Sequence, residues 1–232
     1  MIDAHIMQKG MKNLAGRMKY STLFVDDQDI KAKTILDIGC GFGWFENYVL
    51  QKGCYEAIGL EIDSDALKKA RDLIKDRRAR FQIGSATNLP FPNSYFDTVI
   101  AWEVIEHIPR KSENQMLQEV YRVLKPKGVF YLSTQNRSLW GNLGDPARWL
   151  IGHRHYSTKE ITALTEVNGF QIQKLVLKGA FWEILAVNNL YFAKWVLHRQ
   201  MLCKQRIIQM LEKEYQKENG FAIIFSRLKK IV

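Results

Sequence analysis

The chain has 232 residues, 47% of them hydrophobic, and a formal net charge of +10. This length supports one substantial core, so we expect a single domain with additions. Three cysteines at unrelated spacings fit neither a disulfide framework nor a zinc site, and they favour a reducing, cytoplasmic location. The N-terminus lacks the apolar region of a signal peptide. The apolar run "ILAVNNLYFA" ends after ten residues, too few to span a bilayer.

Short apolar runs bounded by glycine or polar residues recur through the first 134 residues, as buried strands do. Helical patterns separate them, and alternation of this kind predicts a doubly wound, Rossmann-like α/β fold with a mostly parallel sheet. The predicted strands are 34–39, 56–62, 79–85, 96–103 and 128–134.

Three of the predicted helices carry end signals. Ser64 is expected to cap the helix that follows it, and Pro126 to end a helix over 113–125. Ser157 and Glu160 have the spacing of a capping box, and Gly169 stands where that helix should stop.

The stretch "LDIGCGFGWF" (36–45) joins the first strand to a helix through Gly39, Gly41 and Gly43. Such a turn lets backbone approach a ligand at the carboxyl end of a strand. A dinucleotide fingerprint would place its third glycine at Trp44, and no lysine followed by Ser or Thr makes a P-loop. Asp37 adds a carboxylate, so the pattern indicates a cofactor without phosphates and with a positive end.

These residues resemble the first motif of class I S-adenosylmethionine-dependent methyltransferases, and other motifs follow in that family's order. "GLEID", "GSATNLPFPNSYFD", "AWEVIEHI" and "EVYRVLKPKGVFYLST" extend the resemblance over about 34–170. It implies that Glu61 binds the two ribose hydroxyls. The family usually has Asp after Gly84; here Ser85 can still accept a hydrogen bond, without charge assistance, so cofactor affinity is expected to be lower.

S-adenosylmethionine is therefore the expected cofactor. Trp102 is expected either in the pocket wall or in the core. The candidate cofactor-binding residues are Asp37, Gly39, Cys40, Gly41, Gly43, Glu61, Ile62, Ser85, Ala86 and Trp102.

The segment "EVIEH" supplies Glu103, Glu106 and His107 as candidates for chemistry. Helical backbone over 103–107 would place all three on one face. They then suit two roles. His107, with Glu106, is a candidate catalytic base, needed if the acceptor must lose a proton. Alternatively, all three residues bind a divalent metal such as Mg²⁺, an arrangement similar to that of ubiquinone-pathway O-methyltransferases. A packed, structural His107 is the remaining alternative.

The segment 135–157 is too long and too aromatic for a plain connector, and we expect it to shape the acceptor pocket. Arg137 and Trp149 belong to the same segment, and structural roles for the two histidines remain open. The candidate substrate-binding residues are Asn136, Trp140, His153, His155 and Tyr156.

The predicted organisation is a single methyltransferase domain, with an N-terminal helical cap (1–33) and a cofactor-binding core (34–179). The family resemblance implies an antiparallel edge formed by strands at 170–179 and 220–230. A helical insertion (180–219) separates them, and a final strand occupies 220–232. Basic and aromatic residues over 181–217 suit either a hairpin packed on the domain or a second subunit, or a peripheral contact with an anionic membrane at its inner face.

The expected function is methyl transfer to oxygen, or less readily nitrogen, of a small-molecule, glycan or lipid-linked acceptor. Residues 171–232 hold 11 Lys or Arg against 4 Asp or Glu, which raises nucleic-acid binding or RNA modification as an alternative. Against it, "WEVIEH" stands where amino-methylating nucleic-acid enzymes have N/D-P-P-Y/F, so no nucleic-acid partner is expected. A cofactor-binding module without turnover is a third possibility.

Overall fold

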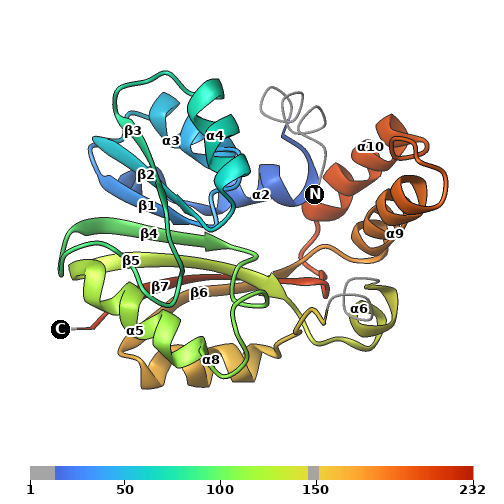
Figure 1. The fold of residues 1–232 in the computed structure, drawn as a ribbon. Coiled ribbons are helices and arrows are strands. Elements are labelled where there is room, and N and C mark those ends of the chain that lie inside the picture. The colour runs from blue at the N-terminus through green and yellow to red at the C-terminus, as the bar shows by residue number, and fades with distance from the viewer. Residues whose placement is uncertain (1–13, 146–151, 232) are drawn as a thin grey trace.

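The computed structural model describes residues 14–145 and 152–231. A seven-stranded sheet runs through its centre in the order β3-β2-β1-β4-β5-β7-β6 (Figure 1). β7 runs antiparallel to both of its neighbours, and the remaining pairs are parallel. The strands are β1 (Thr34–Ile38), β2 (Glu56–Glu61), β3 (Ala79–Ile83), β4 (Phe96–Trp102), β5 (Leu124–Gln135), β6 (Phe170–Lys178) and β7 (Ile223–Lys230).

Helices cover both faces of this sheet, as the alternating pattern predicts (Figure 1). One face carries α2 and α3, and the other carries α5 and α8. The helices are α2 (Gly16–Phe24), α3 (Trp44–Gln51), α4 (Ser64–Leu73), α5 (Glu113–Val123), α6 (Leu139–Gly144), α8 (Thr158–Val167), α9 (Phe181–Trp195) and α10 (Lys204–Tyr215), with a 3-10 turn at Asp27–Asp29.

Each face buries its own apolar cluster. α5 turns Met116, Leu117, Val120 and Val123 inward, all fully buried, which confirms the periodicity of that stretch. On the opposite face Phe45 of α3 packs among aromatic side chains. The strand order reverses between β1 and β4, so the carboxyl ends of these two strands flank the crevice where open α/β sheets bind ligands.

Three local expectations are wrong. Asp63, not Ser64, caps α4, because its carboxylate accepts from the backbone N–H groups of Asp65 and Ala66. α5 ends at Val123, before Pro126, because the chain already pairs with β4 at Leu124 and then bulges over 125–128. Residues 103–107 form a turn and not a helix. The turn begins at Glu103, whose φ is +55°.

The end signals of α8 and the last strands agree with the structure. Ser157 and Glu160 form the capping box, and Gly169 takes a φ of +84° just after the helix. β6 and β7 form the predicted antiparallel pair.

Residues 180–219 contain the predicted helices, α9 and α10, which form a hairpin beside the sheet (Figure 1). The Glu214 carboxylate ties the two together by accepting from the N–H groups of Ala180, Trp182 and Glu183 at the start of α9, 2.7 to 3.0 Å away. α10 also packs against α2. Of the expected N-terminal cap, residues 1–13 lie outside the described residues. No helix in the described part of the chain is long and apolar enough to cross a membrane.

Candidate cofactor and acceptor site

The glycine turn after β1 needs glycine for both conformation and space. Gly39 has a φ of +75°, and a Cβ there would lie 2.7 Å from Val104 Cγ2. Gly43 has a φ of +80°, and a Cβ would meet Ile74 Cδ1 at 2.6 Å. A Cβ at Gly41 would meet no atom within 4 Å, so this point of the turn opens outward. The contact with Val104 sets the turn directly beside residues 103–107.

Three carboxylates gather below and beside the glycine turn. Asp37 is buried, and its burial, with Glu46 and Glu61 nearby, raises the pKa of Asp37 well above its ordinary value. Glu46, on α3, is buried with no hydrogen-bond partner for either carboxylate oxygen within the described chain. Burial raises the pKa of Glu46 to about 8. A cationic ligand bound here would favour the ionised forms of these carboxyl groups.

Glu61 binds the glycine turn itself. Its Oε2 accepts from the Gly41 N–H at 3.0 Å, and its Oε1 accepts from the N–H groups of Ile62 and Asp63 at 2.7 and 3.2 Å. The carboxylate at the end of β2 thus holds the turn after β1 in place.

The other candidate cofactor residues fall into two groups. Ile62 is exposed beside Glu61, and the Ser85 hydroxyl lies 2.9 Å from the Thr87 hydroxyl in the turn after β3. Cys40 and Ala86 are buried, and burial raises the pKa of the Cys40 thiol, so it is no nucleophile. Trp102 is buried with its ring against Phe45, Tyr131 and Phe225, which assigns it to the core.

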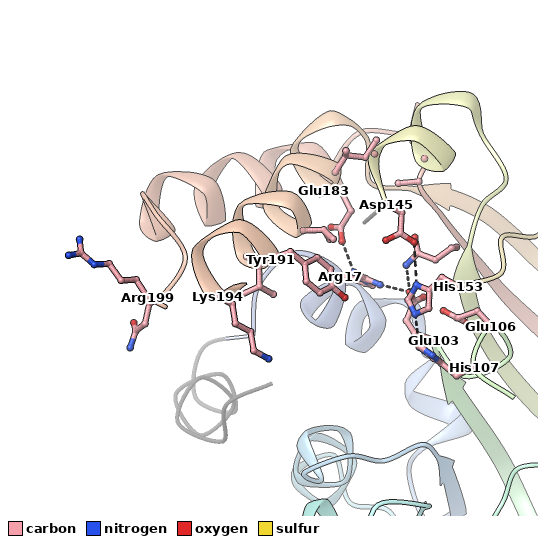
Figure 2. Close-up of a pocket in the computed structure, with 18 of the residues that line it drawn as sticks. Arg17, Glu103, Glu106, His107, Asp145, His153, Glu183, Tyr191, Lys194 and Arg199 are labelled. Atoms are coloured by element: carbon pink, nitrogen blue, oxygen red, sulfur yellow. Dashed lines mark hydrogen bonds and ion pairs between the residues drawn. The ribbon is translucent and has the colours of Figure 1, made fainter. Parts of the chain in front are cut away.

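A cavity of about 750 Å³ opens next to the 103–107 turn. Its floor is the carboxyl ends of β4 and β5, and α9 forms one wall (Figure 2). Polar groups from Glu103, Glu106, His107, Gln135 and His153 line the inner end. The α9 wall consists largely of Ile184, Val187, Leu190 and Tyr191. Both its volume and its mixed lining are typical of a small-molecule site.

Arg17, from α2, lies at the inner end of the cavity and was not predicted. It forms ion pairs with Glu103 of the turn and Glu183 of α9 (Figure 2). Burial alone would lower the pKa of Arg17, but these two carboxylates hold it well above its ordinary value. Glu183 also accepts from the Tyr215 hydroxyl at 2.9 Å. The Arg17 guanidinium therefore connects α2, the turn after β4 and the α9–α10 hairpin.

Glu103 and Glu106 differ in their surroundings. Glu103 accepts from Ser133 Oγ at 2.8 Å and Gln135 Nε2 at 2.7 Å, in addition to its ion pair with Arg17. Glu106 is buried; its Oε2 accepts from the Thr134 hydroxyl at 2.9 Å, and burial, with Glu103 close by, raises its pKa well above its ordinary value. Its Oε1 has no partner among the described residues, and Glu106 lines the cavity.

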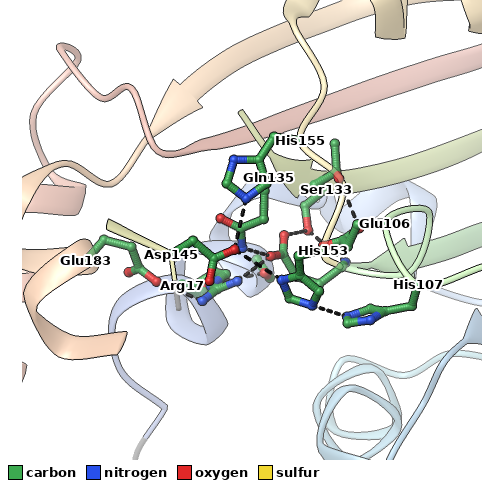
Figure 3. Close-up of polar contacts among 12 residues, drawn as sticks. Arg17, Glu106, His107, Ser133, Gln135, Asp145, His153, His155 and Glu183 are labelled. Atoms are coloured by element: carbon green, nitrogen blue, oxygen red, sulfur yellow. Dashed lines mark hydrogen bonds and ion pairs between the residues drawn. The ribbon is translucent and has the colours of Figure 1, made fainter. Parts of the chain in front are cut away.

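His107 begins a chain of polar contacts that runs back into the protein (Figure 3). Its Nε2 lies 3.1 Å from Nε2 of His153, whose Nδ1 lies 3.2 Å from Asp145 Oδ2. The same Asp145 oxygen lies 2.9 Å from His155 Nε2. Burial of part of its ring, and His153 beside it, lower the pKa of His107 below its ordinary value. His107 is thus neutral at neutral pH and can accept a proton.

The residues predicted to bind substrate divide around this cavity. His153 lines it, whereas His155 is buried behind it and holds Asp145. Asn136 donates to the Phe221 carbonyl and the Tyr156 hydroxyl donates to the Ile105 carbonyl, and neither residue lines the cavity. Trp140 is exposed outside the cavity against Phe181.

The metal-binding alternative gains no geometric support. Because 103–107 is a turn, Glu103 points to Arg17, Glu106 to Thr134 and His107 to His153, in separate contacts. Among the described residues, no group of three His, Cys, Asp or Glu side chains is arranged to hold a metal ion.

The fold and this site together define a class: a doubly wound α/β protein with a glycine turn after β1 beside a cavity of small-molecule size. Residues 36–132 match the methyltransferase domain family. This part of the chain is similar to S-adenosylmethionine-dependent methyltransferases, and the cofactor that this likeness implies is S-adenosylmethionine.

Individual relatives support the same family. A Mycolicibacterium smegmatis protein named as a probable S-adenosylmethionine-dependent methyltransferase is 32% identical over 54% of this chain and 52% of its own. Tocopherol O-methyltransferase of Arabidopsis thaliana is 30% identical over 50% of this chain and 34% of its own. Norajmaline N-methyltransferase of Rauvolfia serpentina is 30% identical over 53% and 42%. The chain thus spans about half or less of these relatives' length.

The fold has close counterparts among solved structures. An S-adenosylmethionine-dependent methyltransferase from Mesorhizobium loti superimposes with a TM-score of 0.68, covering 95% of this chain and 100% of the other at 16% identity. At that identity the likeness is evidence for the fold.

Proposed function

We propose that this chain transfers a methyl group from S-adenosylmethionine to an oxygen atom of a small-molecule, glycan or lipid-linked acceptor bound in the cavity under α9. The observation that carries the proposal is the contact chain from Asp145 through His153 to His107, which ends at the cavity beside the glycine turn.

The cofactor site fits a sulfonium compound by its charge. S-adenosylmethionine supplies an electrophilic methyl group and carries positive charge without phosphates. Asp37 and Glu61 would hold it, with the Gly39 to Gly43 turn against it. The raised pKa values of Asp37 and Glu46 mark a site whose burial of negative charge a cationic ligand would offset.

His107 would act as the base for the acceptor. A hydroxyl attacks readily only if its proton is removed, whereas a neutral amine already has a free electron pair. If His153 donates through Nδ1 to Asp145, its Nε2 accepts from His107 Nε2–H, which leaves His107 Nδ1 with the free pair. The proton moves from the acceptor hydroxyl to that nitrogen, and Asp145 stabilises the cation formed.

The remaining polar groups would position the acceptor. Arg17 and Gln135 fix the Glu103 carboxylate at the cavity floor. The raised pKa of Glu106 favours its protonated form, in which it could donate a hydrogen bond to the acceptor, and its Oε1 has no partner among the described residues. The wall of Ile184, Val187 and Tyr191 suits an acceptor with a hydrocarbon part.

The test measures S-adenosylhomocysteine release over a panel of hydroquinones, sugars, lipid-linked sugars and amines, with His107→Gln compared to His198→Gln. His198 lies at the outer end of the cavity and serves as the matched control. His107→Gln should lower kcat about 10²-fold or more at unchanged cofactor affinity, the range typical of a lost general base. Equal activity of His107→Gln and the wild type on a hydroxyl acceptor would refute the assignment, and turnover of amines alone would move the reaction to nitrogen.

The pH profile adds a second readout. The base must be neutral, and its pKa lies below the ordinary value of about 6.5, so wild-type kcat should fall only as the pH drops through a value below that. His107→Gln should lack this acid limb. A limb that persists in the variant would assign it to another group.

A further inference from the structure

The far end of the α9–α10 hairpin is an exposed apolar surface. We define the hairpin tip as residues 192–206, the last turn of α9, the connection and the first residues of α10. Phe192, Trp195 and Val196 are 51%, 46% and 60% exposed, and Leu197 and Leu202 are exposed beside them. Of the large hydrophobic side chains exposed elsewhere in the described chain, most stand apart from one another in sequence. A cluster of this kind marks an interaction surface.

α9 is mostly apolar, with Glu183, Asn188, Asn189 and Lys194 as its polar residues, and only part of its surface is covered. Ala186 and Ala193 face the core, and Ile184, Val187 and Tyr191 face the cavity. The third side, with Leu185, Phe192 and Trp195, faces solvent. Large apolar side chains on one side of a helix are normally covered. The exposed side therefore calls for a partner.

The charge around the tip is of one sign. Between Glu183, which is buried, and Glu212 the sequence has no acidic residue, while Lys194, Arg199, Lys204 and Arg206 fall in the same span. Arg199 and Arg206 are exposed, and so is His198. Figure 2 shows Arg199 turned away from the polar groups at the inner end of the cavity. Aromatic and aliphatic residues mixed with cations are the composition of a surface that inserts into an anionic lipid interface.

We propose that the hairpin tip docks on an anionic membrane surface, with Trp195, Val196 and Leu197 among the acyl chains and Arg199 and Arg206 at the headgroups. A second copy of the chain is a poorer partner, because a two-fold contact would bring the same cations together without an acidic residue between 184 and 211 to offset them. Nucleic acid would leave the apolar side chains uncovered.

The position of the tip relative to the cavity gives docking a consequence. His198, Arg199 and Gln200 line the outer end of the cavity as well as belonging to the tip. Docking therefore places the cavity mouth at the lipid surface. An amphiphilic acceptor could enter from the membrane; this last step rests on the proposed function, whereas docking itself does not.

The test is co-sedimentation of the full chain with large unilamellar vesicles of phosphatidylcholine alone or with phosphatidylglycerol added. Binding to the anionic vesicles should be at least about tenfold stronger and should weaken with salt, since each cation near the surface adds to binding. Trp195→Ser with Val196→Ser should weaken it about tenfold, and Arg199→Glu with Arg206→Glu at least as much.

Matched controls come from α8, on another part of the molecule. Val167→Ser removes an apolar side chain that is more exposed than Trp195 or Val196, and Lys159→Glu reverses an exposed charge; neither should change binding. Thermal unfolding confirms that each variant is folded. Failure to sediment with anionic vesicles, or equal loss in the α8 variants, would overturn the proposal. So would a dimer in light scattering that Trp195→Ser dissociates, because a second copy would then cover the tip.

Discussion

The cofactor half and the acceptor half of the site are held together in different ways. In the first, Glu61 binds the backbone of Gly41, 20 residues away, across neighbouring strands. In the second, Arg17 reaches Glu103 and Glu183, 86 and 166 residues away, through side chains alone. Backbone geometry fixes the cofactor half, and side-chain pairing fixes the acceptor half. Changes in the first should therefore affect ligand affinity and fold strongly, whereas changes in the second should be milder and act on the acceptor.

Among the variants that test this comparison, Glu61→Ala is expected to have the largest effect on ligand affinity. The carboxylate accepts three backbone N–H groups, and charge-assisted hydrogen bonds are each worth about 1.5–3 kcal/mol. We expect affinity for S-adenosylhomocysteine, measured by calorimetry, to fall about 100-fold. Glu56→Gln, at the other end of β2, is the control and should bind normally. Similar affinities for both variants would remove Glu61 from the site.

Gly43→Ala lies in the glycine turn, and Gly53→Ala lies just after α3. Together the two variants separate the cost of backbone strain from the cost of overpacking. Both residues have φ near +80°, but a Cβ at Gly43 meets Ile74 and Phe81, while one at Gly53 meets no atom within 4 Å. Positive φ alone costs about 1–2 kcal/mol for an L-residue, so Gly53→Ala should lose that much stability. Gly43→Ala should lose about 1–3 kcal/mol more from overpacking. Denaturant unfolding measures both, and equal losses would contradict the tight packing.

Glu46→Gln tests the buried charge beneath the turn. The pKa of Glu46 in the folded protein is about 8, above its ordinary value of 4.5. At a pH between these two pKa values, the folded protein therefore binds one more proton than the unfolded chain. The free energy of unfolding of the ligand-free wild type should therefore fall as pH rises from about 5 to 8, by roughly 2 kcal/mol or more. Glutamine cannot ionise, so the variant should lose the Glu46 share of that slope and keep the share of Asp37 and Glu106, whose pKa values are raised as well. An unchanged slope in the variant would mean that another group carries it.

Arg17→Gln should have the smallest effect on stability. The guanidinium is partly exposed, so loss of its two ion pairs should cost about 1 kcal/mol, less than a fully buried pair would. KM for the acceptor should rise while cofactor affinity holds. Lys19→Gln removes an exposed pair from the same helix and should change neither. Weakened cofactor binding in Arg17→Gln would show that the two halves are not separable.

The sequence predicted the glycine turn and the acidic end of β2, because local rules determine both. Glycines at alternate positions, an acidic strand end and buried strands are visible in stretches of ten residues. One departure there, Asp63 in place of Ser64 as the cap of α4, is a shift of one residue between two good capping types.

The acceptor half was predicted only in part. The sequence marks His107 and His153 as candidate site residues, but nothing in it pairs them with Asp145 or brings Arg17 to Glu103. The helix expected over 103–107 also misled, because Glu103 takes a left-handed backbone that propensity alone does not predict. Arg17 stands alone in a helix without a motif, and its role depends on contacts across the whole chain.

The most direct test of the account is calorimetric titration of the wild-type protein with S-adenosylmethionine, S-adenosylhomocysteine and NAD. The site contains three carboxyl groups and lacks the glycine pattern that binds phosphates. It therefore predicts micromolar binding of the first two ligands and none of NAD. Binding of NAD with similar affinity, or of neither sulfur compound, would contradict the assignment of this site.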